Sequence, residues 1–134
     1  MTDRKLQWDK CRTLSKQTAN GLPTATGFDW ATDVDGNIWI KSKRTSQKFS
    51  KDDYQAMISH ILGNRGGVPL GSCRDHGVPE DSVGALMEQR RGTASIRGWC
   101  SHLAAIAVKQ NHLGFTDTGR GPGRGIYLHA KKAN

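Results

Sequence analysis

Two arginines in a loop of glycine and proline are the residues with the clearest chemical role in this chain. Arg120 and Arg124 lie within the run Thr118-Gly-Arg-Gly-Pro-Gly-Arg-Gly-Ile126. Glycine lets a backbone approach a ligand closely, and arginine is attracted to the negative potential of a narrow minor groove. The pattern therefore predicts contact with a nucleic acid rather than catalysis.

Positive charge is concentrated in the same third of the chain. The range 90–134 holds eight lysines and arginines and one acid, Asp117, so it carries +7 of the whole chain's net charge of +8. Such a concentration on one structural unit is typical of a protein that binds a polyanion. Nucleic acid is the simplest polyanion that this charge predicts.

Cysteine and histidine pairs suggest a zinc site, but their expected geometry argues against it. Cys73-x-x-His76 and Cys100-x-His102 have short spacings. On a helix, however, His102 points about 160° away from Cys100. A cysteine nucleophile at Cys73 is also disfavoured, because its neighbours Asp75 and His76 point away from each other.

The acidic residues and the glycines favour turns and caps over catalysis. Seven of the twelve acids fall in the hairpin (Asp29, Asp33, Asp35) or at helix starts (Asp52, Asp53, Glu80, Asp81), and the chain has no Gly-Lys-Ser/Thr loop for phosphates. No apolar run approaches the roughly 20 residues of a membrane-spanning helix. We therefore expect a protein that is not an enzyme, needs no metal or cofactor, and works in the cytoplasm.

The first part of the chain predicts a polar arm followed by a hairpin. Residues 1–26 form the arm, and 27–134 form one domain. Phe28, Trp30, Thr32 and Val34 alternate with Asp29, Ala31 and Asp33, and Asp35-Gly36 supplies a turn before the pattern resumes at Ile38 and Ile40.

Three helices and three further strand-like runs are expected after the hairpin, and the first of these runs is Gly66-Gly-Val-Pro-Leu-Gly71, where Pro69 forbids a helix interior. Ser50 and Asp53 form a capping box for a helix that ends at Gly63. A second helix opens at Pro79 and ends near Gly92. The third helix covers 95–112, is capped by Thr93 or Ser95, and ends before Gly114; strand-like runs at 115–118 and 126–129 flank the glycine-arginine loop.

The order of these elements over residues 50–130 resembles the winged helix-turn-helix superfamily. The resemblance implies an α+β fold with a three-helix core and a C-terminal β-hairpin wing, here preceded by the N-terminal hairpin. It also implies that helix 95–112 enters the major groove of duplex DNA while the loop 119–125 acts as the wing.

This resemblance assigns a set of DNA-contacting residues. They are Arg97 and Ser101 at base edges; Arg90, Arg91 and Thr93 at phosphates; Arg120 and Arg124 in the minor groove; and Lys109 and Lys131 as further phosphate anchors. We expect a non-enzymatic duplex DNA-binding protein, either a regulator or a phage or mobile-element accessory protein, associated with the nucleoid and able to form a homodimer.

Two other functions fit the same charge. A small basic phage-type inhibitor would place the wing on an acidic surface of a nucleic-acid-processing protein or complex, with exposed Trp30 or Trp39 of the hairpin 28–40 as contacts. RNA binding is the second alternative. Only Trp99, Phe115 and Tyr127 lie near the basic segment, which argues against a stacking surface for single strands.

Overall fold

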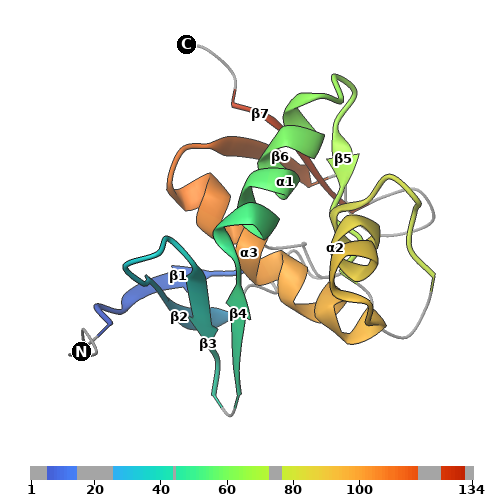
Figure 1. Ribbon diagram of the computed structural model, residues 1–134. Coiled ribbons are helices and arrows are strands. Elements are labelled where there is room, and N and C mark those ends of the chain that lie inside the picture. Colours follow the sequence, from blue (N-terminus) through green and yellow to red (C-terminus); the bar gives the residue numbers. More distant parts are fainter. Residues whose placement is uncertain (1–5, 15–25, 44, 73–76, 118–124, 132–134) are drawn as a thin grey trace.

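The chain folds as an α+β protein in which two antiparallel sheets pack with three α-helices (Figure 1). This computed structural model describes residues 6–14, 26–43, 45–72, 77–117 and 125–131. Within them the elements are β1 (Asp9–Arg12), β2 (Gly27–Thr32), β3 (Ile38–Lys41), β4 (Ser46–Phe49), α1 (Lys51–Leu62), β5 (Val68–Pro69), α2 (Val83–Arg91), the 3-10 turn η1 (Ala94–Ile96), α3 (Arg97–Lys109), β6 (Leu113–Asp117) and β7 (Ile126–Ala130).

The N-terminal sheet is a meander of strand order β1-β2-β3-β4. The expected hairpin is confirmed as β2 and β3, with Trp30 opposite Ile40 and Gly36 at a φ of 85° in the turn. Val34 does not continue the strand, because it lies in this turn and is 75% exposed. The arm contributes strand β1, and β4 extends the sheet on the other side.

The two faces of this sheet differ in polarity, as strand alternation requires. Cys11, Phe28, Trp30, Ile40 and Phe49 are buried and belong to the core. We call the opposite face, which carries the intervening residues, the outer face. Its residues are Lys10, Arg12, Asp29, Ala31, Trp39, Lys41, Ser46 and Lys48.

The first helix begins as expected, and the second begins later. The Ser50 side chain accepts a hydrogen bond from the Asp53 backbone, and the Asp53 carboxylate accepts one from the Ser50 backbone, so the capping box is confirmed. Pro79 does not open α2. Its carbonyl accepts a hydrogen bond from the Ser82 backbone in a turn, and Ser82 is the cap of α2. Gly92, at a φ of 75°, ends α2 as expected.

The third helical segment is shorter than expected and starts as a 3-10 turn. Thr93 caps η1, and α3 ends at Lys109. Asn111 takes the left-handed conformation, with a φ of 64°, and the chain reverses there. Gly114 therefore does not end the helix but lies within β6, opposite His129.

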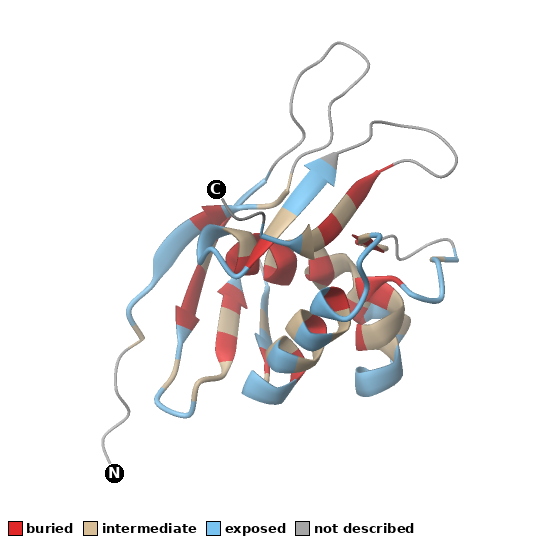
Figure 2. Cartoon of the chain, turned by 90° about the horizontal axis from the view of Figure 1, so that it is seen from above, coloured by how far each residue is buried: buried red, intermediate tan, exposed pale blue. Residues whose placement is uncertain are grey.

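The second sheet has strand order β5-β7-β6. The runs expected beside the glycine-arginine loop are therefore strands, with Phe115 opposite Leu128. Figure 2 shows buried positions on the inward sides of the sheets and helices. In the parts of the chain that the structure describes, no helix has the length and hydropathy to cross a bilayer.

Candidate nucleic-acid interface

Arg90 and Arg91 are bonded to a buried acid. Arg90 Nε donates to Asp53 Oδ1 at 2.8 Å, and Arg91 Nη1 donates to Asp53 Oδ2 at 3.2 Å and to the Lys48 carbonyl at 2.9 Å. Burial raises the pKa of Asp53, but hydrogen bonds from Arg90 and Ser50 outweigh it and hold the pKa below its usual value. These two arginines fasten α2 to the start of α1.

The residues expected at base edges and on the turn also have structural partners. Arg97 Nε donates to Glu88 Oε1 at 2.6 Å, and only 13% of its side chain is exposed. Thr93 Oγ1 accepts from the Ser95 backbone at 3.3 Å. Ser101 is half-buried, with its Oγ 3.4 Å from Nδ1 of His102.

The α3 face expected in the major groove is taken up by packing, with Arg97 bonded to α2 and with Ala105 and Lys109 beside the N-terminal sheet. Every residue from 97 to 108 is buried or half-buried. The His102 ring lies 4.8 Å from that of Phe28 on β2, and burial lowers the pKa of His102. This helix therefore offers little surface for direct reading of bases.

The remaining predicted contacts divide between exposed lysines and positions outside the described residues. Lys109 and Lys131 are exposed. Lys109 Nζ donates to the backbone carbonyl of Lys10 on β1. Arg120 and Arg124, the two wing arginines, lie outside the residues that the structure describes.

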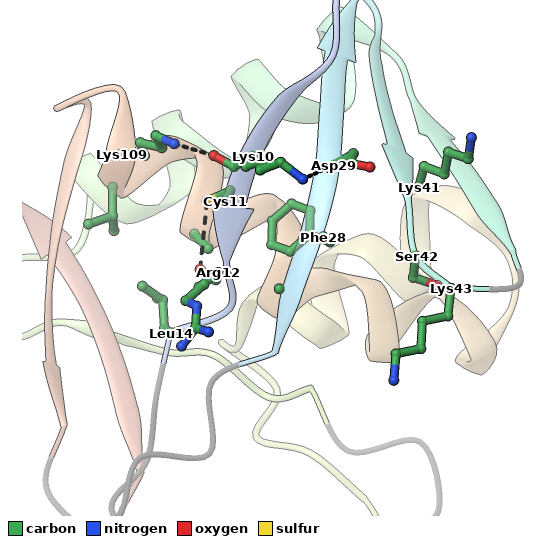
Figure 3. A pocket seen from close by; sticks show the side chains of 13 residues that line it. Lys10, Cys11, Arg12, Leu14, Phe28, Asp29, Lys41, Ser42, Lys43 and Lys109 are labelled. Atoms are coloured by element: carbon green, nitrogen blue, oxygen red, sulfur yellow. Dashed lines mark hydrogen bonds and ion pairs between the residues drawn. The ribbon is translucent and has the colours of Figure 1, made fainter.

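A groove at the junction of β1, β2, the end of β3 and the end of α3 collects cations that the sequence separates. We call it the cationic groove. It has a volume of about 840 Å³, and the side chains of five basic residues line it: Lys10, Arg12, Lys41, Lys43 and Lys109. Asp29 is the single acid among its lining residues. Figure 3 shows Lys10, Arg12 and Lys109 on one side and Lys41 and Lys43 on the other.

The floor of the cationic groove is apolar. Leu14, Phe28, Ala105 and Val108 line it beneath the charged side chains. Asp29 neutralises little of the charge, because its carboxylate is 3.8 Å from Lys10 Nζ and the Lys10 side chain is 92% exposed. The groove therefore combines a net positive rim with a surface for apolar contact.

The two thiols that the structure describes are buried, and burial raises the pKa of each. Burial raises the pKa of Cys100 to about 12, and its Sγ is 3.5 Å from the Ile96 carbonyl. Burial also raises the pKa of Cys11 at the groove, against the lowering effects of a backbone hydrogen bond and of Lys109. Among the described residues no group of three or more potential ligands gathers; Cys73 and His76 lie outside them.

Trp30 and Trp39 were the alternative contacts expected on the hairpin for a protein partner, and the structure places them on opposite faces of the sheet. Trp30 is only 8% exposed, because it points into the core. Trp39 lies on the outer face and is half-buried, and its Nε1 donates to Asp33 Oδ2 at 3.0 Å. Strand alternation puts Trp30 on the buried face of the sheet and leaves Trp39 as the remaining candidate of the two.

The spacing of the basic residues in the N-terminal part of the chain is a sequence signal for the cationic groove. Lys10 and Arg12 are two residues apart within β1 and so share one face of the strand, while Lys43 follows Lys41 in the bend after β3. The signal is incomplete, because only the pairing of β1 with β2 and of β2 with β3 brings the two pairs together.

No family model, curated protein or solved structure matches this chain. The function is therefore inferred from the geometry and charge described above.

Proposed function

We propose that this protein binds nucleic acid without catalysing a reaction, and that the cationic groove is its main contact. One observation carries the proposal. Five basic side chains from separate segments line one groove with a single acid. Lysine and arginine at such a density neutralise successive phosphates, and the release of counterions from the nucleic acid supplies much of the affinity.

The arrangement of residues 50–130 supports a winged-helix core within this protein. The element order α1-β5-α2-α3-β6-β7 agrees with the order that the resemblance implies, and β6 and β7 pair with each other as the expected C-terminal hairpin does. In this proposal packing against α2 and the N-terminal sheet occupies the face of α3 that would meet the major groove, and so phosphate contact moves to the junction of that sheet with Lys109. The loop 119–125, with Arg120 and Arg124, is proposed as a second contact.

The salt dependence of binding tests the groove. A Lys10→Gln, Lys43→Gln double variant removes two charges from it, and a Lys51→Gln, Arg65→Gln double variant removes two exposed charges elsewhere. If each groove lysine neutralises one phosphate, the slope of log affinity against log salt falls by about 1.4 to 1.8 units. The control variant should keep the wild-type slope.

Three results would count against this proposal. Equal losses in the two double variants would show general attraction rather than a groove. Absence of binding to any DNA or RNA at low salt would end the proposal. For the wing, an Arg120→Gln, Arg124→Gln variant with unchanged affinity would exclude the loop as a contact.

A further inference from the structure

Two tryptophans lie next to the cationic groove on the outer face of the N-terminal sheet. Trp8, just before β1, is 41% exposed, and Lys41 Nζ lies 5.8 Å from its ring centroid. Trp39 on β3 has Lys48 Nζ 5.4 Å from its ring centroid. Each indole is therefore paired with a cation on the same surface.

Strand register places these residues in two neighbouring rows. One row joins Lys10, Asp29, Lys41 and Ser46 across β1 to β4. The next row joins Ala31, Trp39 and Lys48. Ala31 is only 2% exposed although it points outward, so larger side chains already form a layer over this part of the sheet.

The tryptophan surface is continuous with the cationic groove. A hollow of about 470 Å³ is lined by Trp8 and Trp39 together with Lys41, Ser42 and Lys43. The last three residues also line the cationic groove. A chain leaving the groove past Lys43 and Lys41 would therefore reach the face of Trp8 directly.

We propose that this surface binds single-stranded nucleic acid, with an unpaired base stacked on Trp8 and the adjoining phosphates held by Lys41, Lys43 and the rest of the cationic groove. The inference deepens the proposed function and rests on it. Its chemistry is shared by single-stranded DNA and RNA: a flat base beside a charged backbone.

The exposed indole is the reason for choosing a single strand over a duplex. In a duplex the base faces are covered by neighbouring base pairs, so a ring on the protein surface has nothing to stack on. A single strand offers those faces, and stacking on an aromatic side chain tolerates any base. Lys41, which now lies over Trp8, would move from the ring to a phosphate when a base takes its place.

Trp39 supports the same surface as a fixed wall. Its indole N–H is held by Asp33 at 3.0 Å, and Asp33 also accepts hydrogen bonds from Asn37. Hydrogen bonding from Trp39, which outweighs burial, lowers the pKa of Asp33, so this anchor stays charged near neutral pH. The ring is therefore held in place before any ligand arrives.

A Trp8→Ala variant tests the proposal with oligo(dT), oligo(U) and a duplex of mixed sequence, all of equal length. We expect wild type to prefer a single strand, and the variant to lose about 5- to 100-fold in single-strand affinity while its duplex affinity stays unchanged. Trp8→Phe should recover much of the loss. Val34→Ala, which truncates an exposed apolar side chain in the β2–β3 turn, should lose nothing.

The outcomes separate this inference from the proposed function. Loss of affinity in Lys10→Gln, Lys43→Gln but not in Trp8→Ala would overturn the stacking surface and leave the groove. Tighter binding of the duplex than of either single strand would also overturn it. So would binding of poly-glutamate, an anionic polymer without bases, as tightly as the single strands and with the same affinity in Trp8→Ala. The tighter of the two oligonucleotides identifies the polymer, and a melting curve by circular dichroism verifies that each variant is folded.

Discussion

Replacing Asp53 with alanine tests whether Arg90 and Arg91 serve the fold rather than a ligand. The Asp53 carboxylate is 8% exposed and accepts hydrogen bonds from both arginines and from the Ser50 backbone. The variant removes all of these at once and leaves two guanidinium groups without their acid.

The expected loss follows from how far each partner is buried. Breaking a buried ion pair by removing one partner costs about 3–5 kcal/mol. Arg90 and Arg91 are 36% and 32% exposed, so water replaces part of what they lose. Together with half of the capping box, we expect Asp53→Ala to lower the free energy of unfolding by about 2–3 kcal/mol. The melting temperature should fall by roughly 10 °C.

Urea unfolding of Asp53→Ala beside Asp52→Ala gives the measurement. Asp52 is exposed in the same first turn of α1, and its removal should cost only about 0.3–1 kcal/mol through the helix dipole. The pKa of Asp53 is lower in the folded protein than in the unfolded chain. Its contribution to the free energy of unfolding is therefore present above the pKa of the unfolded state and is lost as the pH falls through the pKa of the folded state. Equal stability of the two variants at pH 7 would refute the structural role of both arginines.

Three other substitutions or labels test the packing. Gly84→Ala should prevent stable folding or cost more than about 3 kcal/mol, since a Cβ would overlap the backbone carbonyl of Gly71; a melting temperature near wild type would contradict this close approach. Cys100, with its pKa raised to about 12, should resist a thiol reagent at pH 8 in the folded protein and react in urea, and rapid native labelling located by mass spectrometry would refute its burial. Tyr54→Phe removes a hydroxyl 2.7 Å from Nδ1 of His112 and should cost about 0.5–1.5 kcal/mol by urea unfolding; no change would show that water replaces this contact.

Local signals in the sequence correctly predicted the start of α1, the β2–β3 turn and the end of α2, each of which depends on a few adjacent residues. Ser50 with Asp53, Gly36 in its turn and Gly92 after α2 each act through contacts within a few positions. The strands β1 and β4 were missed for the opposite reason. Each has four residues of which one is buried, so the alternation is too short to recognise, and only pairing with β2 and β3 makes them strands.

Counting charges along the chain misplaced the candidate site. Three of the arginines in 90–134 are bonded to acids outside that range, Arg90 and Arg91 to Asp53 and Arg97 to Glu88. The lysines of the N-terminal sheet were overlooked because acids such as Asp33 and Asp35 lie between them in the sequence. In the fold those two acids occupy the β2–β3 turn, and neither lines the cationic groove.

Packing of the N-terminal sheet against α3 both covers this helix and forms the cationic groove. A helix that reads DNA must leave long polar side chains in solvent, yet here Ala105 and Val108 line the groove floor, and His102 packs on Phe28. Burying that face stabilises the junction between the N-terminal sheet and the helical core. The same junction brings Lys109 beside Lys10, so the packing that closes one binding surface also assembles the cationic groove. A variant that detached the N-terminal sheet would therefore lose the proposed site together with the protection of α3.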